Sequence, residues 1–424
     1  MYNISKTVRI TQKYQRGFFK NKWTIYDTST AKEIEIDYAV YLFLKDINEH
    51  EIADENIIFE RAKQYIFKSA DIVKRLMTER VIVEDCKKIC NCNILSPMKV
   101  KFPLTKLIIE LTNACNLRCV HCYGKFGENK NISFITFKEV QNLKSAMDEL
   151  HTKSVALTGG EAILNKEFEK IALFFLENGF KLTIFTNGYE TEKIKSFLEK
   201  TENYRYNISV SLDGNEECHN CIRGNENSFR KTINTLNILK SYSNITTSIS
   251  TTVMRYNYNK LNGFSNDIKN AFPNINHQYT LMMPNADEHI ESFDTEEFDN
   301  VYGFVPEAFM LPQMTDRRYR CRGGITGGSL SSNGNIKICN AAPDLPQFVM
   351  GNIYERGLKE IWSKPSQLTL KYRKERPKHQ EECKKCRNKK TCISKNCRLY
   401  AYGYKKNENS VNPVNCYVEK RGNR

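Results

Sequence analysis

The sequence lacks the features of membrane-spanning, secreted and low-complexity proteins. No apolar run in its 424 residues approaches the roughly 18 residues of a transmembrane helix, and the mean hydropathy is −0.56. The first residues, MYNISKTVRITQKYQRGFF, have neither the apolar centre nor the small-residue cleavage site of a signal peptide. No internal repeat is found. We therefore expect a soluble, cytoplasmic protein without a membrane partner, long enough for about three domains.

Acidic side chains are fewer than basic ones, 49 against 64, which gives a net charge of +15 and favours an acidic partner. Nucleic acid, an anionic cofactor or an acidic peptide would each satisfy this charge. Cysteine, in contrast, is abundant: there are 15, an odd number, and they occur in clusters. In a cytosolic chain, clustered cysteines indicate metal or redox chemistry rather than a disulfide framework.

The first 97 residues predict a small separate unit. Two strands, 17–27 and 32–37, are followed by three helical stretches. This order is typical of a winged-helix-like module, and the alternative is a simple N-terminal extension. The helical stretches are 38–47, 55–67 and 70–79. In the link that follows, Cys86, Cys90 and Cys92 lack completing ligands, so incidental thiols are the favoured interpretation.

From residue 104 to about 300 the pattern changes to strands alternating with helices, which predicts a parallel α/β sheet. Six such units are too few for a closed eight-fold barrel, so we expect a partial (β/α)6 barrel with its chemistry at the carboxyl ends of the strands. The expected strands are Lys106–Leu111, Ser154–Thr158, Lys181–Phe185, Asn207–Leu212, Ile245–Val253 and His277–Met283. Residues 315–424 are rich in Gly, Lys, Asn and Cys and predict an irregular domain held together by metal.

The loop after the first of these strands reads TNACNLRCVHCYG and places Cys115, Cys119 and Cys122 at C-x3-C-x2-C spacing. Three thiolates can hold three irons of a [4Fe-4S] cluster and leave the fourth iron open to a ligand. A structural zinc is the rival interpretation, but only His121 offers a fourth ligand nearby.

This loop resembles the signature of radical S-adenosylmethionine enzymes, and later strand ends extend the resemblance. Leu157–Glu161 is similar to the GGE motif of that family, whose main chain contacts the methionine amino group, and two glycines allow such close approach. The resemblance implies catalytic roles for the three cysteines and S-adenosylmethionine contacts along the strand ends. One of the two serines, Ser209 or Ser211, would act together with Arg223 and hold the methionine carboxylate or the ribose. The implied cofactor-binding residues are Tyr123, Gly159, Gly160, Glu161, Asn187, Ser209, Ser211, Asp213 and Arg223. Cys218 and Cys221, a C-x2-C pair in the same stretch, are interpreted as ordinary helix cysteines.

The C-terminal cysteines resemble the SPASM extension, which carries two auxiliary iron–sulfur clusters. The resemblance implies a distal cluster with four ligands: Cys383, Cys386, Cys392 and Cys416. It implies a nearer cluster on Cys321, Cys339 and Cys397. Four residues separate Cys392 from Cys397, one more than in the family pattern, which leaves the assignment of Cys397 open. The stretch RGGITGGSLSSNG lacks the additional cysteine of many relatives, so an open iron could accept a substrate thiolate. A non-cysteine ligand or a smaller cluster is the alternative. Asn340 stands where sulfatase-maturing relatives have a carboxylic acid that serves as the catalytic base, which argues against that activity here.

Residues 1–97 resemble the PqqD-like peptide-recognition element of enzymes that mature ribosomally made peptides. The combined resemblance implies a radical S-adenosylmethionine/SPASM maturase with three [4Fe-4S] clusters that forms a cysteine thioether in a precursor peptide. The N-terminal module would bind the leader, and a flavodoxin- or ferredoxin-type protein would supply electrons. Carbon–carbon crosslinking, epimerisation and maturation of another protein are alternatives. A zinc-ribbon protein that binds nucleic acid is a remote one, because it leaves the motifs at the strand ends unexplained.

Overall fold

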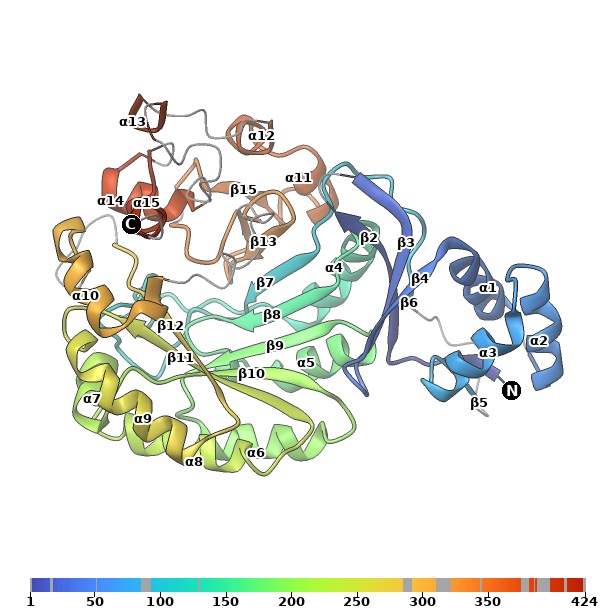
Figure 1. The fold of residues 1–424 in the computed structure, drawn as a ribbon, viewed down its shortest axis with the longest axis horizontal. Coiled ribbons are helices and arrows are strands. Elements are labelled where there is room, and N and C mark those ends of the chain that lie inside the picture. Colours follow the sequence, from blue (N-terminus) through green and yellow to red (C-terminus); the bar gives the residue numbers. More distant parts are fainter. Residues whose placement is uncertain are drawn as a thin grey trace.

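A computed structural model describes the protein over residues 2–15, 18–50, 52–84, 93–128, 130–284, 292–309, 322–343, 345–374, 381–384, 386, 397–407 and 410–421. The chain forms an N-terminal module, a large central sheet with helices, and a C-terminal segment that extends this sheet (Figure 1). Within the described residues, no helix combines the length and the apolar character needed to span a bilayer. Cys86, Cys90 and Cys92 lie outside the described residues.

The N-terminal module packs helices against a four-stranded sheet of order β4-β3-β2-β6. Asp37 caps the first helix by accepting a hydrogen bond from the Val40 amide, which fixes the point where strand turns into helix. Trp23 stacks on Tyr41 at 3.7 Å between ring centroids and joins sheet to helix. The sheet strands are β2 (Val8–Gln15), β3 (Phe18–Asp27), β4 (Glu33–Asp37) and β6 (Asn93–Ile94), and a separate pair joins β1 (Tyr2–Ile4) to β5 (Ile82–Glu84). The helices are α1 (Tyr38–Glu49), α2 (Glu55–Lys63) and α3 (Ser69–Thr78).

The two predicted strands and three predicted helices of this module are present, but the sequence interpretation missed β1, β2 and β6. Strand β2 alternates apolar and polar residues only over its first four positions, and its polar residues Arg9, Thr11 and Gln12 are buried. Arg9 is 1 % exposed and donates to the Thr152 carbonyl and to Asp148, at 2.9 and 2.6 Å. Because one partner is a loop carbonyl and the other is a side chain of a helix, both in another unit, the local sequence of β2 gives no sign of them.

The central sheet contains the six predicted parallel strands in chain order. They are β7 (Lys106–Glu110), β8 (Ser154–Thr158), β9 (Lys181–Thr186), β10 (Tyr206–Ser211), β11 (Ile245–Val253) and β12 (Asn276–Leu281). The connecting helices lie along the outer side of the curved sheet (Figure 1). They are α4 (Phe137–Glu149), α5 (Phe168–Glu177), α6 (Thr191–Lys200), α7 (Glu216–Arg223), α8 (Ser228–Leu239) and α9 (Leu261–Ala271).

The C-terminal segment is more regular at its start than the sequence suggested. Three further strands continue the central sheet past β7, so that the whole sheet has nine strands. They are β13 (Gly327–Leu330), parallel to β7, followed by the antiparallel β14 (Asn335–Lys337) and β15 (Val349–Asn352). Gly328 makes this packing possible, because a Cβ there would lie 2.8 Å from the buried Trp362 ring. Helix α10 (Phe298–Phe304) precedes these three strands. The helices after them are α11 (Leu358–Ser363), α12 (Gln367–Lys374), α13 (Glu381–Lys384), α14 (Arg398–Lys405) and α15 (Pro413–Arg421).

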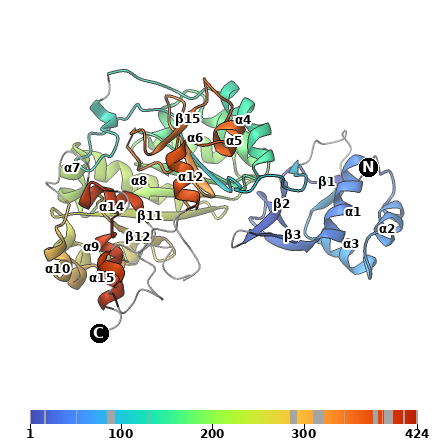
Figure 2. The same ribbon diagram turned by 90° about the horizontal axis from the view of Figure 1, so that it is seen from above.

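The module meets the central sheet at the amino-terminal ends of its strands. The contacts go to the turns that precede β8, β9 and β10: the amide of Gln12 donates to His151, Gly179 packs on Arg9, and the amide of Arg205 donates to Thr28. Figure 2 shows the module to one side of the remaining chain. The carboxyl ends of the strands, where the cysteine loop follows β7, therefore lie at the opposite end of the sheet.

Candidate functional site

The predicted site begins with the cysteine loop after β7. The loop is held by Thr112, whose hydroxyl donates to the Ser133 carbonyl and accepts from the Ala114 amide, both at 2.9 Å. The Cys122 amide donates to the Cys119 carbonyl at 3.1 Å and folds the loop back on itself. Cys115, Cys119 and Cys122 are free, half-buried thiols.

Burial raises the pKa of the Cys115 thiol to about 12, with the charges of Glu161 and the two other loop cysteines adding to it. Burial also raises the pKa of Cys119, against the opposing effect of the Arg223 guanidinium. A soft metal would compensate such thiolates, which are the usual ligands of iron–sulfur clusters. Two buried polar atoms at this loop, His121 Nδ1 and Arg223 Nε, have no hydrogen-bond partner in the described structure. The donor set and these atoms fit a cluster, although the described residues do not gather three potential metal ligands into one site.

The end of β8 packs directly on the cysteine loop. The Gly160 amide donates to the Thr112 carbonyl, and the Glu161 amide donates to the Ala114 carbonyl, both at 2.9 Å. A Cβ at Gly159, which has φ +147°, would lie 2.3 Å from the Thr112 oxygen, and one at Gly160 would lie 2.2 Å from the Ala114 oxygen. The two glycines therefore allow two stretches of main chain to touch, a role that the sequence had assigned only to ligand approach.

Glu161 joins β8 to the end of β9. Its buried carboxylate accepts from the Asn187 amide at 2.7 Å. Burial raises the pKa of Glu161 to about 7, against the lowering effect of this hydrogen bond. The Asn187 side chain donates to Asn116 of the cysteine loop at 2.8 Å, and Asn116 donates to Glu190 at 3.0 Å. Asn116 was missed from the sequence, although its place between two of the cysteines could have marked it.

Ser209 and Ser211 occupy alternate positions of β10 and therefore share one face of the strand. Ile208 and Val210, on the opposite face, belong to the hydrophobic core between sheet and helices. Both serines thus face away from the helices. The orientation of the strand therefore does not decide which of the two would contact the cofactor.

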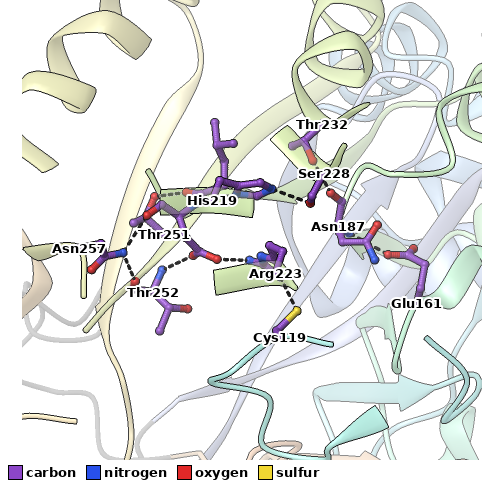
Figure 3. A network of polar contacts seen from close by, with 12 residues as sticks. Cys119, Glu161, Asn187, His219, Arg223, Ser228, Thr232, Thr251, Thr252 and Asn257 are labelled. Carbon is purple, nitrogen blue, oxygen red and sulfur yellow. Dashed lines mark hydrogen bonds and ion pairs between the residues drawn. The ribbon is translucent and has the colours of Figure 1, made fainter. Parts of the chain in front are cut away.

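Asp213 and Arg223 form a buried ion pair at the next strand end, with 2.6 Å between Oδ2 and a guanidinium nitrogen. Asp213 Oδ1 accepts from the Thr252 amide at 2.9 Å, and the Asp213 amide donates to His219 Nδ1 at 3.1 Å. Burial opposes the charged form of this carboxyl, but Arg223 outweighs it and lowers the pKa of Asp213. Figure 3 shows Arg223 extending toward Cys119, whose Sγ lies 3.6 Å from the Arg223 Nη1 nitrogen.

Tyr123 connects the cysteine loop to the C-terminal strands. Its hydroxyl donates to Glu110 Oε1 at 3.0 Å, and Lys337 Nζ of β14 lies 3.7 Å from the same oxygen. Glu110 and Lys337 are both buried, which makes them charged residues inside the fold that sequence reasoning overlooked. Glu110 ends β7 directly before the cysteine loop, and that position could have identified it.

The C-terminal cysteines are described in part. Cys339 follows β14 and its thiol lies 3.5 Å from Asn340 Oδ1, and Cys339 and Cys397 pack against the same hydrophobic core. Cys383 lies in α13 and Cys386 shortly after it, and Cys416 lies in α15. Cys321 and Cys392 lie outside the described residues. Ligation of the two auxiliary clusters stays a prediction. Cys218 and Cys221 are free thiols of α7, as expected for helix cysteines.

Two family models match the chain: the radical SAM superfamily over residues 109–267, and the iron–sulfur cluster-binding domain SPASM over residues 321–387. The antilisterial bacteriocin subtilosin biosynthesis protein AlbA of Bacillus subtilis is 22 % identical over 290 residues, which cover 65 % of this chain and 63 % of AlbA. This chain thus matches less than two thirds of the length of that relative.

Solved structures share the fold. Streptococcus suis SuiB bound to the precursor peptide SuiA has a TM-score of 0.64 at 16 % identity and covers 98 % of this chain and 100 % of its own. The protein anSMEcpe with bound AdoMet has a TM-score of 0.60 at 20 % identity and covers 75 % of this chain and 92 % of its own.

Proposed function

Because the chain belongs to the radical S-adenosylmethionine superfamily of enzymes and carries a SPASM iron–sulfur domain, we propose that it matures a ribosomally made precursor peptide by forming a cysteine thioether. The observation that carries the peptide substrate is the similarity in fold, over 98 % of the chain, to a protein solved with its precursor peptide. The name of the Bacillus subtilis relative, which refers to bacteriocin biosynthesis, supports the same class of substrate.

The N-terminal module (residues 1–97) offers an edge for the leader part of such a peptide. Strand β4 is the last strand of its sheet, so one of its sides lacks a paired strand among the described residues. An extended peptide can add to an edge of this kind through main-chain hydrogen bonds. Lys13 and Lys22 both pair with Glu35 of β4, and Glu33 of the same strand is exposed.

Leader docking at β4 is testable by hydrogen exchange. Leader peptide should slow amide exchange in Glu33–Asp37, while β6 at the other edge of the same sheet keeps its rate. Protection confined to other segments, with β4 unchanged at saturating peptide, would disprove docking at this edge.

In this proposal Cys115, Cys119 and Cys122 hold the cluster that binds S-adenosylmethionine. When bound, cluster and cofactor together supply the hydrogen-abstracting chemistry of the superfamily, after reduction by a flavodoxin- or ferredoxin-type protein. The chain itself positions the loop through the main-chain contacts of Gly159 and Gly160. The other proposed cofactor contacts are Tyr123, Glu161, Asn187, Ser209, Ser211, Asp213 and Arg223.

Two further [4Fe-4S] clusters would be held by the C-terminal cysteines. We assign Cys383, Cys386, Cys392 and Cys416 to the distal cluster. Cys321, Cys339 and Cys397 would hold the nearer one and leave one position for a peptide thiol. Forming each sulfur–carbon bond removes one hydrogen from the carbon, which would be taken up in deoxyadenosine when S-adenosylmethionine is reductively cleaved. The thiol hydrogen would leave as a proton, and the remaining electron would pass to an auxiliary cluster.

A buried carboxylate directly before the cysteine loop can take up a proton in this chemistry. The Glu110 carboxylate, which is paired with Lys337 and accepts a hydrogen bond from the Tyr123 hydroxyl, could accept the thiol proton of the substrate. Because the peptide is made on the ribosome, the reaction would take place in the cytoplasm.

The experiment is co-expression with a cysteine-containing peptide encoded beside the gene, followed by thiol alkylation and mass spectrometry. The proposal expects loss of two hydrogens per link, with the linked thiols resistant to alkylation. Cys221→Ala, an exposed cysteine outside the site, should retain this activity. Loss of hydrogens with free thiols would indicate carbon–carbon crosslinking, and an unchanged mass would indicate epimerisation or another substrate.

A further inference from the structure

Arg223 lies where it can act on the sulfur of a cluster ligand. Arg223 is 7 % exposed, and its Nη1 nitrogen donates to Cys119 Sγ at 3.6 Å. The other terminal nitrogen, Nη2, lies 2.6 Å from Asp213 Oδ2. The two ends of one planar group are thus engaged by an acid on one side and by a thiol on the other (Figure 3).

The position of Arg223 is fixed by its surroundings. Asp213, which holds it, is fully buried and accepts a second hydrogen bond from the Thr252 amide. The amide of Asp213 donates to His219 Nδ1, and His219 Nε2 pairs with the Ser228 hydroxyl at 2.9 Å. Because each member of this chain of contacts is held by the next, the guanidinium cannot turn away from Cys119 without breaking the buried ion pair.

The cysteine loop is also tied to the helix that carries Arg223. The Arg118 amide donates to the Arg223 carbonyl at 3.1 Å, and the Val120 amide donates to the Ile222 carbonyl at 3.0 Å. Helix α7 ends at Gly224 with φ +65°, where a Cβ would lie 2.8 Å from the Arg118 oxygen. Main chain and side chain of the helix end therefore hold Cys119 from both sides.

We propose that Arg223 is a positioning residue that donates a hydrogen bond to the Cys119 sulfur and raises the reduction potential of the cluster on Cys115, Cys119 and Cys122. A donor and a positive charge beside a ligand sulfur stabilise the reduced, more negative cluster, because hydrogen bonds to the sulfurs and net charge are what set such potentials. Asp213 limits the effect by compensating part of the charge. This proposal rests on superfamily membership and is independent of the peptide substrate.

The test is the midpoint potential of this cluster in the complete protein, measured by a redox titration followed by electron paramagnetic resonance without S-adenosylmethionine. The cluster is identified as the one whose spectrum changes when S-adenosylmethionine is added afterwards. The variants are Arg223→Gln, Arg223→Lys and Asp213→Asn, each with its iron content measured. Arg230→Gln on α8 is the matched control, because Arg230 is exposed and contacts only Asn227 among the interactions described.

Opposite shifts are expected from the two sides of the ion pair. Arg223→Gln removes the charge and should favour the oxidised cluster about tenfold, which for a one-electron couple lowers the potential by about 59 mV. Asp213→Asn leaves the Arg223 charge uncompensated and should raise the potential. Arg223→Lys keeps the charge but cannot reach both partners, and its potential should lie between those of Arg223→Gln and the wild type.

Three results would overturn the proposal. One is a potential of Arg223→Gln equal to that of Arg230→Gln at the same iron content. Another is a shift of the same sign in Arg223→Gln and Asp213→Asn, which would indicate general distortion of the loop. A third is an unchanged potential with weakened S-adenosylmethionine binding, which would assign Arg223 to the cofactor alone. If Arg223→Gln loses iron, the shifts of Arg223→Lys and Asp213→Asn decide in the same way.

Discussion

His151 makes the contact between the N-terminal module and the central sheet dependent on pH. The ring is 1 % exposed, and its Nδ1 accepts from the Gln12 amide at 3.2 Å, so this nitrogen carries no proton. Nε2 donates to the Ser96 carbonyl at 2.8 Å. Burial lowers the pKa of His151 to about 4; the Ser96 carbonyl opposes this and the Arg9 charge adds to it. The folded protein therefore keeps this ring neutral.

The sign of the pH effect follows from the two states. In the unfolded chain His151 takes up a proton below its ordinary pKa of 6.5, whereas the folded chain holds it neutral down to about 4. Stability is therefore complete above pH 6.5 and falls as the pH drops toward 4. Each pH unit in this window is worth about 1.4 kcal/mol. Between pH 7.5 and pH 5 the contribution of His151 should thus fall by about 2 kcal/mol.

Urea unfolding followed by tryptophan fluorescence measures this contribution, because the Trp23 ring lies 6.2 Å from the His151 ring. His151→Gln is the informative variant: its amide can accept from Gln12 and donate to Ser96, but it does not titrate. The gap in free energy of unfolding between wild type and variant should change by about 2 kcal/mol from pH 7.5 to pH 5. His50→Gln, at an exposed histidine of the same module, should follow the wild type. Parallel curves for wild type and His151→Gln would refute a buried neutral histidine here.

Three further perturbations test the same structure. Arg9→Met should destabilise the contact of module and sheet by about 2–3 kcal/mol, because the charged hydrogen bonds to Thr152 and Asp148 are lost. The half-buried Asp148 keeps its ion pair with Lys144. Faster hydrogen exchange in β2 would show the destabilisation, and an unchanged exchange rate would contradict it. Gly160→Ala should lower the iron content, because its Cβ would overlap the main chain of the cysteine loop; full iron loading with normal activity would exclude this role. Cys115→Ala should abolish cleavage of S-adenosylmethionine, measured as deoxyadenosine, and continued production would remove Cys115 from the proposed ligands.

The central part of the fold could be predicted from the sequence because its signals are local. The six parallel strands are short apolar runs separated by helical periodicity, and a capping box, Thr136 with Glu139, starts α4. Parallel strands in sequential order bring their carboxyl ends to one edge, so motifs at successive strand ends had to lie near one another. Contacts between Gly160 and the cysteine loop, and between Glu161 and Asn187, follow from this arrangement.

Strands that depend on distant partners could not be predicted in the same way. Polar residues make up most of β2. Arg9 is buried only because the unit of the central sheet supplies a loop carbonyl, a carboxylate of α4 and the Phe180 ring, 3.8 Å from the guanidinium carbon. Strands β13–β15 are three or four residues long and contain Gly327 and Gly328, so their propensity is weak. They form because β13 pairs with the edge of β7 that β8 does not occupy.

In the candidate site, too, the sequence indicates where a residue lies but not which other residue it contacts. The sequence placed Asp213 and Arg223 at one strand end, but it could not show that they pair with each other and with Cys119. That choice of partners depends on the path of the main chain at Gly214, before α7, and at Gly224, which ends it, where φ is +149° and +65°. Chemistry-bearing residue types are thus readable from the sequence, whereas the contacts that tune them depend on turn geometry, and substitution of both sides of the Asp213–Arg223 pair tests that distinction directly.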